Sequence, residues 1–181
     1  LTSSLSIAAT VLLEACSSSG GESGPTPVAN TTAPQLIATW GTGCIITQNT
    51  GSTTTTGASG GGGGGSIAGG EASISAAVFH QTGRVEFTTE YYATANCNSN
   101  TLAGVSRYNG IYQIGNAGLA NDGSPVTEVD ISDGASTTYS IFQVLNSSSL
   151  YLGDSAASSA GNNGGSEGAR LDGLGPGMLK L

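Results

Sequence analysis

Residues 72–92 read ASISAAVFHQTGRVEFTTEYY, and this stretch decides the fold. Apolar and polar side chains alternate in both of its halves, which is the pattern of β-strands with one buried face. Three residues, 81–83, separate the halves and end in glycine, so the stretch predicts a β-hairpin. The core face of the second half is expected to carry Val85, Phe87, Thr89 and Tyr91. The core face of the first half is expected to carry Ile74, Ala76 and Val78.

Shorter strand-like runs lie on both sides of this hairpin. They cover residues 36–40, 44–46, 108–114, 126–132, 138–145, 150–153 and 177–181. Gly41 and Gly43 interrupt the first run and indicate a bulge or a close backbone approach. About eight antiparallel strands in sequence order predict an all-β fold, an up-and-down sheet curled into a barrel, because closure removes exposed edges. A flattened β-sandwich is the alternative.

Composition limits both the domain organisation and the partners. The chain has 181 residues, of which 30 are glycine, 12 are acidic and 4 are lysine or arginine, and its net charge is −8. So few basic side chains cannot neutralise a run of phosphates, and no nucleic-acid partner is therefore expected. We expect one β-barrel domain over residues 35–181. Disordered insertions are expected near 48–70 and 155–168, where small and polar residues dominate.

The N-terminal segment indicates where the protein is located. Residues 5–13 are apolar but far shorter than the roughly 20 residues that a membrane-spanning helix needs. Residues 1–15 therefore predict a signal peptide, truncated at its N-terminus because no methionine or basic residue precedes the apolar run. The alternative is that residues 5–13 form a helix or strand of the core. Residues 16–34 are rich in serine, glycine and proline and are expected to form an unfolded tether.

Residues 13–16, Leu-Glu-Ala-Cys, resemble the lipobox of bacterial lipoproteins. The resemblance implies that Cys16 becomes the first residue of the mature chain and carries a lipid. It also implies a membrane partner reached through that lipid, and Ser17 is compatible with sorting to the outer membrane.

Two cysteines remain once Cys16 is assigned to the anchor. In an exported, oxidising compartment Cys44 and Cys97 are expected to form a disulfide. Free thiols or a metal pair are the alternatives, but zinc needs two further ligands and His80 is the only histidine. Glu128 and Asp130, two residues apart, are read as a solvated strand face rather than as calcium ligands. No metal and no cofactor are expected.

The domain as a whole resembles small lipoproteins of Gram-negative envelopes that carry a lipocalin-like β-domain. The features that carry the resemblance are Trp40 before Cys44, Tyr92 before Cys97, and residues 110–115, 139–142, 150–154 and 170–172 (GIYQIG, YSIF, LYLGD and RLD). Trp40, Tyr91 and Tyr112 are the aromatic residues expected either to fill the core or to contact a ligand.

Three classes of function fit such a domain to different degrees. The first is a membrane-anchored, non-enzymatic envelope lipoprotein that binds a small apolar ligand or an envelope component, since an eight-stranded barrel can hold one small ligand. The second is a cell-surface structural or interaction protein without a small-molecule ligand. The third, an enzyme, is not expected. Glu86 and Glu90 lie about 13–14 Å apart along a strand, whereas the carboxyl groups of glycosidases lie about 5–9.5 Å apart.

Overall fold

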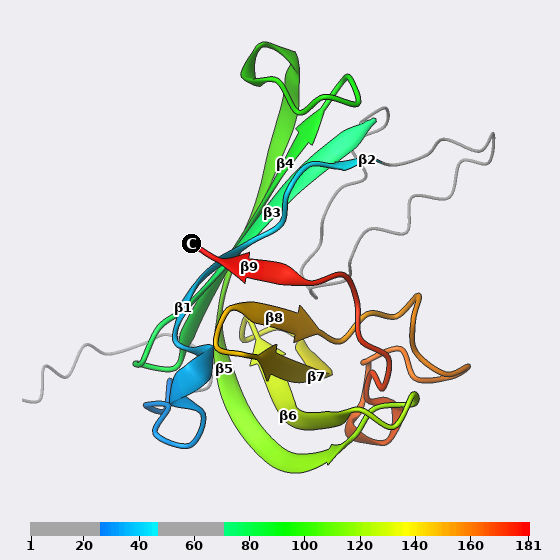
Figure 1. Ribbon diagram of the computed structural model, residues 1–181. Helices are drawn as coiled ribbons and strands as arrows, with labels where there is room; N and C mark the ends of the chain where they lie inside the picture. The colour runs from blue at the N-terminus through cyan, green and yellow to red at the C-terminus, as the bar shows by residue number, and fades with distance from the viewer. Residues whose placement is uncertain (1–25, 47–70) are drawn as a thin grey trace, which may run out of the picture.

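The computed structural model describes residues 26–46 and 71–181, which form one antiparallel sheet of nine strands (Figure 1). The strands are β1 Ala38–Gly41, β2 Ile45–Ile46, β3 Ala72–Phe79, β4 Arg84–Tyr92, β5 Leu102–Leu119, β6 Pro125–Ser132, β7 Thr137–Leu145, β8 Ser149–Leu152 and β9 Met178–Lys180. The helices in the described part are three short 3₁₀ turns: η1 Pro34–Leu36, η2 Ser99–Thr101 and η3 Glu167–Ala169.

The sheet closes on itself through β1. Each strand from β3 to β9 pairs with the next, and β1 pairs with β9 on one side and with β3 on the other. Eight strands therefore form a closed up-and-down barrel, and β2 is one extra strand beside β3. The predicted all-β barrel is confirmed, and this closure excludes the sandwich alternative.

A bulge separates β1 from β2. Gly41 pairs with Ala76 and Ile45 pairs with Ser73, so β1 and β2 contain one residue more than β3 over this stretch. Thr42 fills the gap, because its backbone N–H donates to the Ser75 carbonyl at 2.8 Å and its hydroxyl accepts from the Ser75 N–H at 2.8 Å. The predicted bulge between Gly41 and Gly43 is thereby confirmed.

The long strand β5 connects two parts of the molecule (Figure 1). Its residues 102–110 pair with β4, and its pairing with β6 begins at Ile111. The distal parts of β2, β3, β4 and β5 therefore extend beyond the barrel as an open sheet, which we call the extension. The hairpin β3–β4 is confirmed, with strands that match the predicted runs to within one residue.

The expected core face of β3 was wrong. Ala77 and Phe79 are buried, and they pair with Phe87 and Val85 of the predicted core face of β4. Because partners across a ladder share a face, Ile74, Ala76 and Val78 lie on the outer face, where all three are half-buried. Phe79 decides which face of β3 is buried, because its ring packs edge-on against Phe87 and Tyr112, at centroid distances of 5.9 and 5.2 Å.

The folded domain begins before the predicted end of the tether at residue 34. Asn30 is buried, and its side chain both donates to the Ala33 carbonyl and accepts from the Ala33 N–H, each at 2.9 Å. The Asn30 N–H also donates to the Gln81 carbonyl at 2.8 Å. Ala33 and Leu36 are buried in the core. Residues 30–36 therefore belong to the barrel, and the tether boundary is corrected to a point before Asn30.

Residues 155–168 also differ from expectation, because they form a defined loop rather than a disordered insertion. The Asp172 carboxylate accepts from the Ser159 N–H at 2.7 Å and from its hydroxyl at 2.6 Å. The Ser158 hydroxyl accepts from two backbone N–H groups, those of Asp172 and Gly173. Short polar side chains thus order a segment that has little apolar surface. The predicted signal peptide at residues 1–15, Cys16 and the insertion at 48–70 lie outside the described residues.

Candidate functional site

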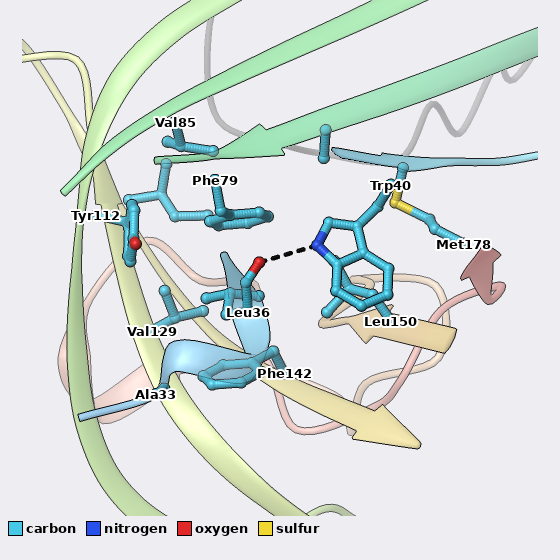
Figure 2. Close-up of a cluster of buried hydrophobic side chains, with 12 residues drawn as sticks. Ala33, Leu36, Trp40, Phe79, Val85, Tyr112, Val129, Phe142, Leu150 and Met178 are labelled. Atoms are coloured by element: carbon cyan, nitrogen blue, oxygen red, sulfur yellow. Dashed lines mark hydrogen bonds between the residues drawn. The ribbon is translucent and has the colours of Figure 1, made fainter. Parts of the chain in front are cut away.

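The barrel interior is the first candidate site, since a ligand was expected there. Figure 2 shows that Trp40, Phe79, Tyr112 and Leu36 point into it together. All four are at most 1% exposed. The Trp40 indole Nε1 donates to the Leu36 carbonyl at 2.9 Å, and the Tyr112 hydroxyl donates to the His80 carbonyl at 2.8 Å. The polar ends of both rings are therefore satisfied within the protein, and their rings fill the interior.

Tyr91 lies apart from the other two predicted aromatic residues. It pairs with Ser73 and Gly104 in the extension and is half-buried. Its neighbour Tyr92 is buried on the opposite face, where its hydroxyl donates to the Glu90 carboxylate at 2.6 Å. That bond, together with burial and the negative charge of Glu90, raises the pKa of Tyr92. The structure therefore brings Trp40 and Tyr112 together but places Tyr91 outside their cluster.

The disulfide Cys44–Cys97 is present, with 5.8 Å between the two Cα atoms. It joins the bulge between β1 and β2 to the turn that leads into η2, so it links the β1–β2 connection to the β4–β5 connection. Cys97 has a positive φ of 46°, in the left-handed region. The link fixes one end of the extension, and the predicted pairing of these two cysteines is confirmed.

Tyr108 carries a buried hydroxyl that has no hydrogen-bond partner within the described residues. Its ring packs against Phe87, with the centroids 6.0 Å apart, and lies over Gly110. Burial raises the pKa of Tyr108 to about 12, and the negative charge of Asp133 adds to the shift. A neutral hydroxyl without a partner is tolerated here, whereas its ionised form is strongly disfavoured.

This raised pKa predicts a loss of stability at high pH. An unfolded tyrosine releases its proton near pH 10, while folded Tyr108 keeps its proton up to about pH 12, so stability falls as the pH rises between these values. Tyr108→Phe is expected to leave stability at pH 7 unchanged or slightly raised, and to move the alkaline unfolding midpoint to higher pH. Circular dichroism during an alkaline titration measures both. Tyr91→Phe is the matched control, and a clear loss of stability in Tyr108→Phe at pH 7 would contradict the assignment.

Two open hollows lie on the outside of the described part. The larger one, of about 290 Å³, lies between Pro27, the N-terminus of β4 at Arg84 and the turn that contains Asp133. The smaller one, of about 190 Å³, lies between the end of β5 and the loop that contains Arg170. Neither is lined by the aromatic residues of the interior.

Arg170 is a functional candidate that the sequence pattern did not single out. Its guanidinium bonds the Asp130 carboxylate at 2.6 Å and the Ser140 carbonyl at 2.9 Å, and lies 3.6 Å from the Glu128 carboxylate. Its side chain is only 13% exposed. The guanidinium also lies 5.4 Å from the centre of the Tyr139 ring. The predicted solvated face of Glu128 and Asp130 is therefore covered by a cation.

Arg170, Glu128 and Asp130 form a charge cluster that holds the loop before β9 against the outer face of β6 and β7. Three carboxyl groups line the smaller hollow: Glu128 contacts Arg170, Asp172 accepts from Ser159, and the third belongs to Glu167. The sequence signal for the charge cluster is that Arg170 is the one basic residue between Arg107 and Lys180. A lone cation in a long acidic stretch, with two carboxylates on one strand face, is a sign of a charge cluster.

The remaining polar candidate is His80, which lies at the β3–β4 turn as expected. Its Nε2 lies 3.2 Å from the Glu86 carboxylate, and both side chains are exposed. Within residues 26–46 and 71–181, no three histidine, cysteine or acidic side chains are arranged to hold a metal ion. The helices in those same ranges are too short or too polar to cross a bilayer.

No family model, curated protein or solved structure matches this chain. The closed eight-stranded antiparallel barrel is consistent with a lipocalin-like domain. Function is therefore inferred from the fold and from the geometry of these sites.

Proposed function

We propose that this chain is a membrane-anchored, non-enzymatic envelope lipoprotein whose barrel contacts partners through its outer surface. The observation that favours surface contact over ligand storage is that side chains fill the barrel interior. Trp40, Phe79, Tyr112 and Leu36 occupy the position that a small apolar ligand takes in a hollow barrel. The geometry therefore favours the structural or interaction role over the carrier role.

The anchoring part of the proposal rests on three features. Cys16 lies in the segment that resembles a lipobox, and the disulfide Cys44–Cys97 fits an exported, oxidising location. The barrel is joined to that segment at one end, since Asn30 binds the β3–β4 turn through Gln81. A lipid on Cys16 would hold this end towards the outer membrane and leave the extension pointing away from it.

Mass spectrometry of the protein purified from bacterial membranes tests both parts. We expect a diacylglyceryl modification on Cys16, and we expect Cys16→Ala to be released from the membrane fraction. We also expect the native mass to equal that of the lipidated chain, without a bound apolar molecule. A stoichiometric apolar ligand would overturn the interaction role, and an unmodified Cys16 in a membrane-bound protein would overturn the anchor.

A further inference from the structure

The disulfide Cys44–Cys97 lies at the surface of the extension. Cys44 is exposed and Cys97 is half-buried. Both cysteines belong to connections, one between β1 and β2 and the other between β4 and β5, and neither belongs to a barrel strand. Residues 42–44 and 93–101, which form these connections, carry no charged side chain. A thiolate can therefore approach the bond from solvent without meeting a carboxylate of either connection.

The backbone at Cys97 is held in a sparsely populated conformation. Its φ of 46° lies in the left-handed region, which is unfavourable for a residue that carries a Cβ atom. The surrounding turn is held by its own hydrogen bonds, since Ala93 N–H donates to the Thr101 carbonyl and Thr101 N–H donates to the Asn98 carbonyl, each at 2.8 Å. Cleavage of the disulfide lets Cys97 relax while the turn keeps these bonds. Exposed or strained disulfides are the ones that exchange readily.

Strand β2, which follows Cys44 directly, has little else to hold it in place. It consists of Ile45 and Ile46, which pair with Ser73 and Ala72 of β3. Ile45 is 38% exposed and Ile46 is 57% exposed, so neither side chain buries much apolar surface. Figure 1 shows β2 beside β3 and away from β6, β7 and β8. The ladders of β1 with β3 and β9, by contrast, close the barrel independently of the disulfide.

We propose that Cys44–Cys97 is a site of thiol–disulfide exchange, which a dithiol opens in the folded protein and thereby releases β2 from β3. One thiolate of the dithiol attacks the exposed Cys44 Sγ, the bond to Cys97 breaks, and the Cys97 sulfur leaves as a thiolate that takes up a proton. The second thiol of the reductant then attacks the mixed disulfide and frees Cys44 as a thiol. Two electrons and two protons pass to the protein, and the dithiol becomes a disulfide. This inference goes beyond the proposed function and does not depend on the anchor.

Reduction kinetics without denaturant test the site. The full chain carries Cys16→Ala, which leaves only these two cysteines, the probe is dithiothreitol, and alkylation with mass spectrometry counts the free thiols. We expect a rate that is proportional to the dithiothreitol concentration and within about tenfold of the rate for the urea-unfolded chain. A bond that opened only through global unfolding would react roughly a thousandfold more slowly or less, because so little of a stable domain is unfolded. Reduction as slow as that would overturn the proposal.

A pair of charge variants tests whether the attack occurs at this surface. Ala95 is exposed, and its carbonyl oxygen lies 3.7 Å from the Cys44 Sγ. At low ionic strength Ala95→Lys is expected to speed reduction about threefold and Ala95→Glu to slow it about threefold, because the attacking group is an anion. Ala160→Lys and Ala160→Glu, at an exposed position of the 155–168 loop, are the matched controls and should leave the rate unchanged. Equal rates for the two Ala95 variants would contradict attack on the exposed sulfur.

Hydrogen–deuterium exchange measures the release of β2. After reduction we expect faster exchange in peptides that cover residues 45–46 and 72–73, while peptides from β6 and β7 keep their protection. The double variant Cys44→Ser with Cys97→Ser should show the same pattern without a reductant. Oxidised glutathione should re-form the bond in the reduced chain and restore the protection. Unchanged exchange at residues 45–46 would refute the release of β2, and lost protection across β6 and β7 would refute a local opening.

Discussion

Replacing Trp40 by alanine is expected to lower the free energy of unfolding by about 3–5 kcal/mol, which is the range for removing a buried large aromatic side chain. Trp40 is 0% exposed and contacts the core that joins β1, β8 and β9. The substitution also leaves the buried Leu36 carbonyl without the indole N–H. Urea unfolding followed by circular dichroism measures the loss, since the variant has no tryptophan left for fluorescence.

Two further variants make this result interpretable. Trp40→Phe keeps a ring in the core but loses the hydrogen bond, and should cost about 1–3 kcal/mol, so it remains measurable if the alanine variant does not fold. Tyr91→Ala removes a ring that is only half-buried in the extension and should cost less than Trp40→Ala. Equal losses for Tyr91→Ala and Trp40→Ala would show that the interior is not tightly filled around Trp40.

Breaking the disulfide is expected to cost about 4 kcal/mol in the chain-entropy model, because its cysteines are separated by 53 positions in the sequence. A loss of this size is a large share of the stability of a small domain. In a Cys16→Ala background, urea unfolding with and without a reductant measures it as a shift of the midpoint.

The double variant Cys44→Ser with Cys97→Ser is the control for that measurement. It should unfold like the reduced parent and should not respond to the reductant. An unchanged midpoint on reduction of the parent would mean that the bond does not constrain the unfolded chain. The constraint acts on the unfolded state, so the barrel ladders themselves are expected to persist at low urea.

Strand order and turns were predictable from sequence because apolar alternation and turn residues act locally. The core face of β3 was not predictable, because its two alternating sets are both apolar. Ile74, Ala76 and Val78 compete with Ala77 and Phe79, and only the contacts of Phe79 with Phe87 and Tyr112 decide between them. Those contacts depend on β5, which is distant in sequence, so no local pattern reports them.

The ordered polar segments were missed for a related reason. Residues 30–34 and 155–168 have the composition of a tether and of a loop, and composition does not show which side chains bond to the backbone. The ring of hydrogen bonds between Asn30 and Ala33 orders the first segment, and Asp172 with Ser159 orders the second. The candidate core residues Trp40 and Tyr112 were found because large aromatic side chains within apolar strands are usually buried. Arg170 was not found, because its partner Asp130 is 40 residues away.

The packing of residues 30–36 against the barrel has a mechanical consequence. A pulling force applied to the chain upstream of Asn30 would first load the single backbone bond from Asn30 to Gln81, and then the anchoring of Ala33 and Leu36 in the core. The ladder between β1 and β3 would bear tension only after these contacts had broken. The contacts of residues 30–36 therefore bear a force transmitted along the chain before the sheet does.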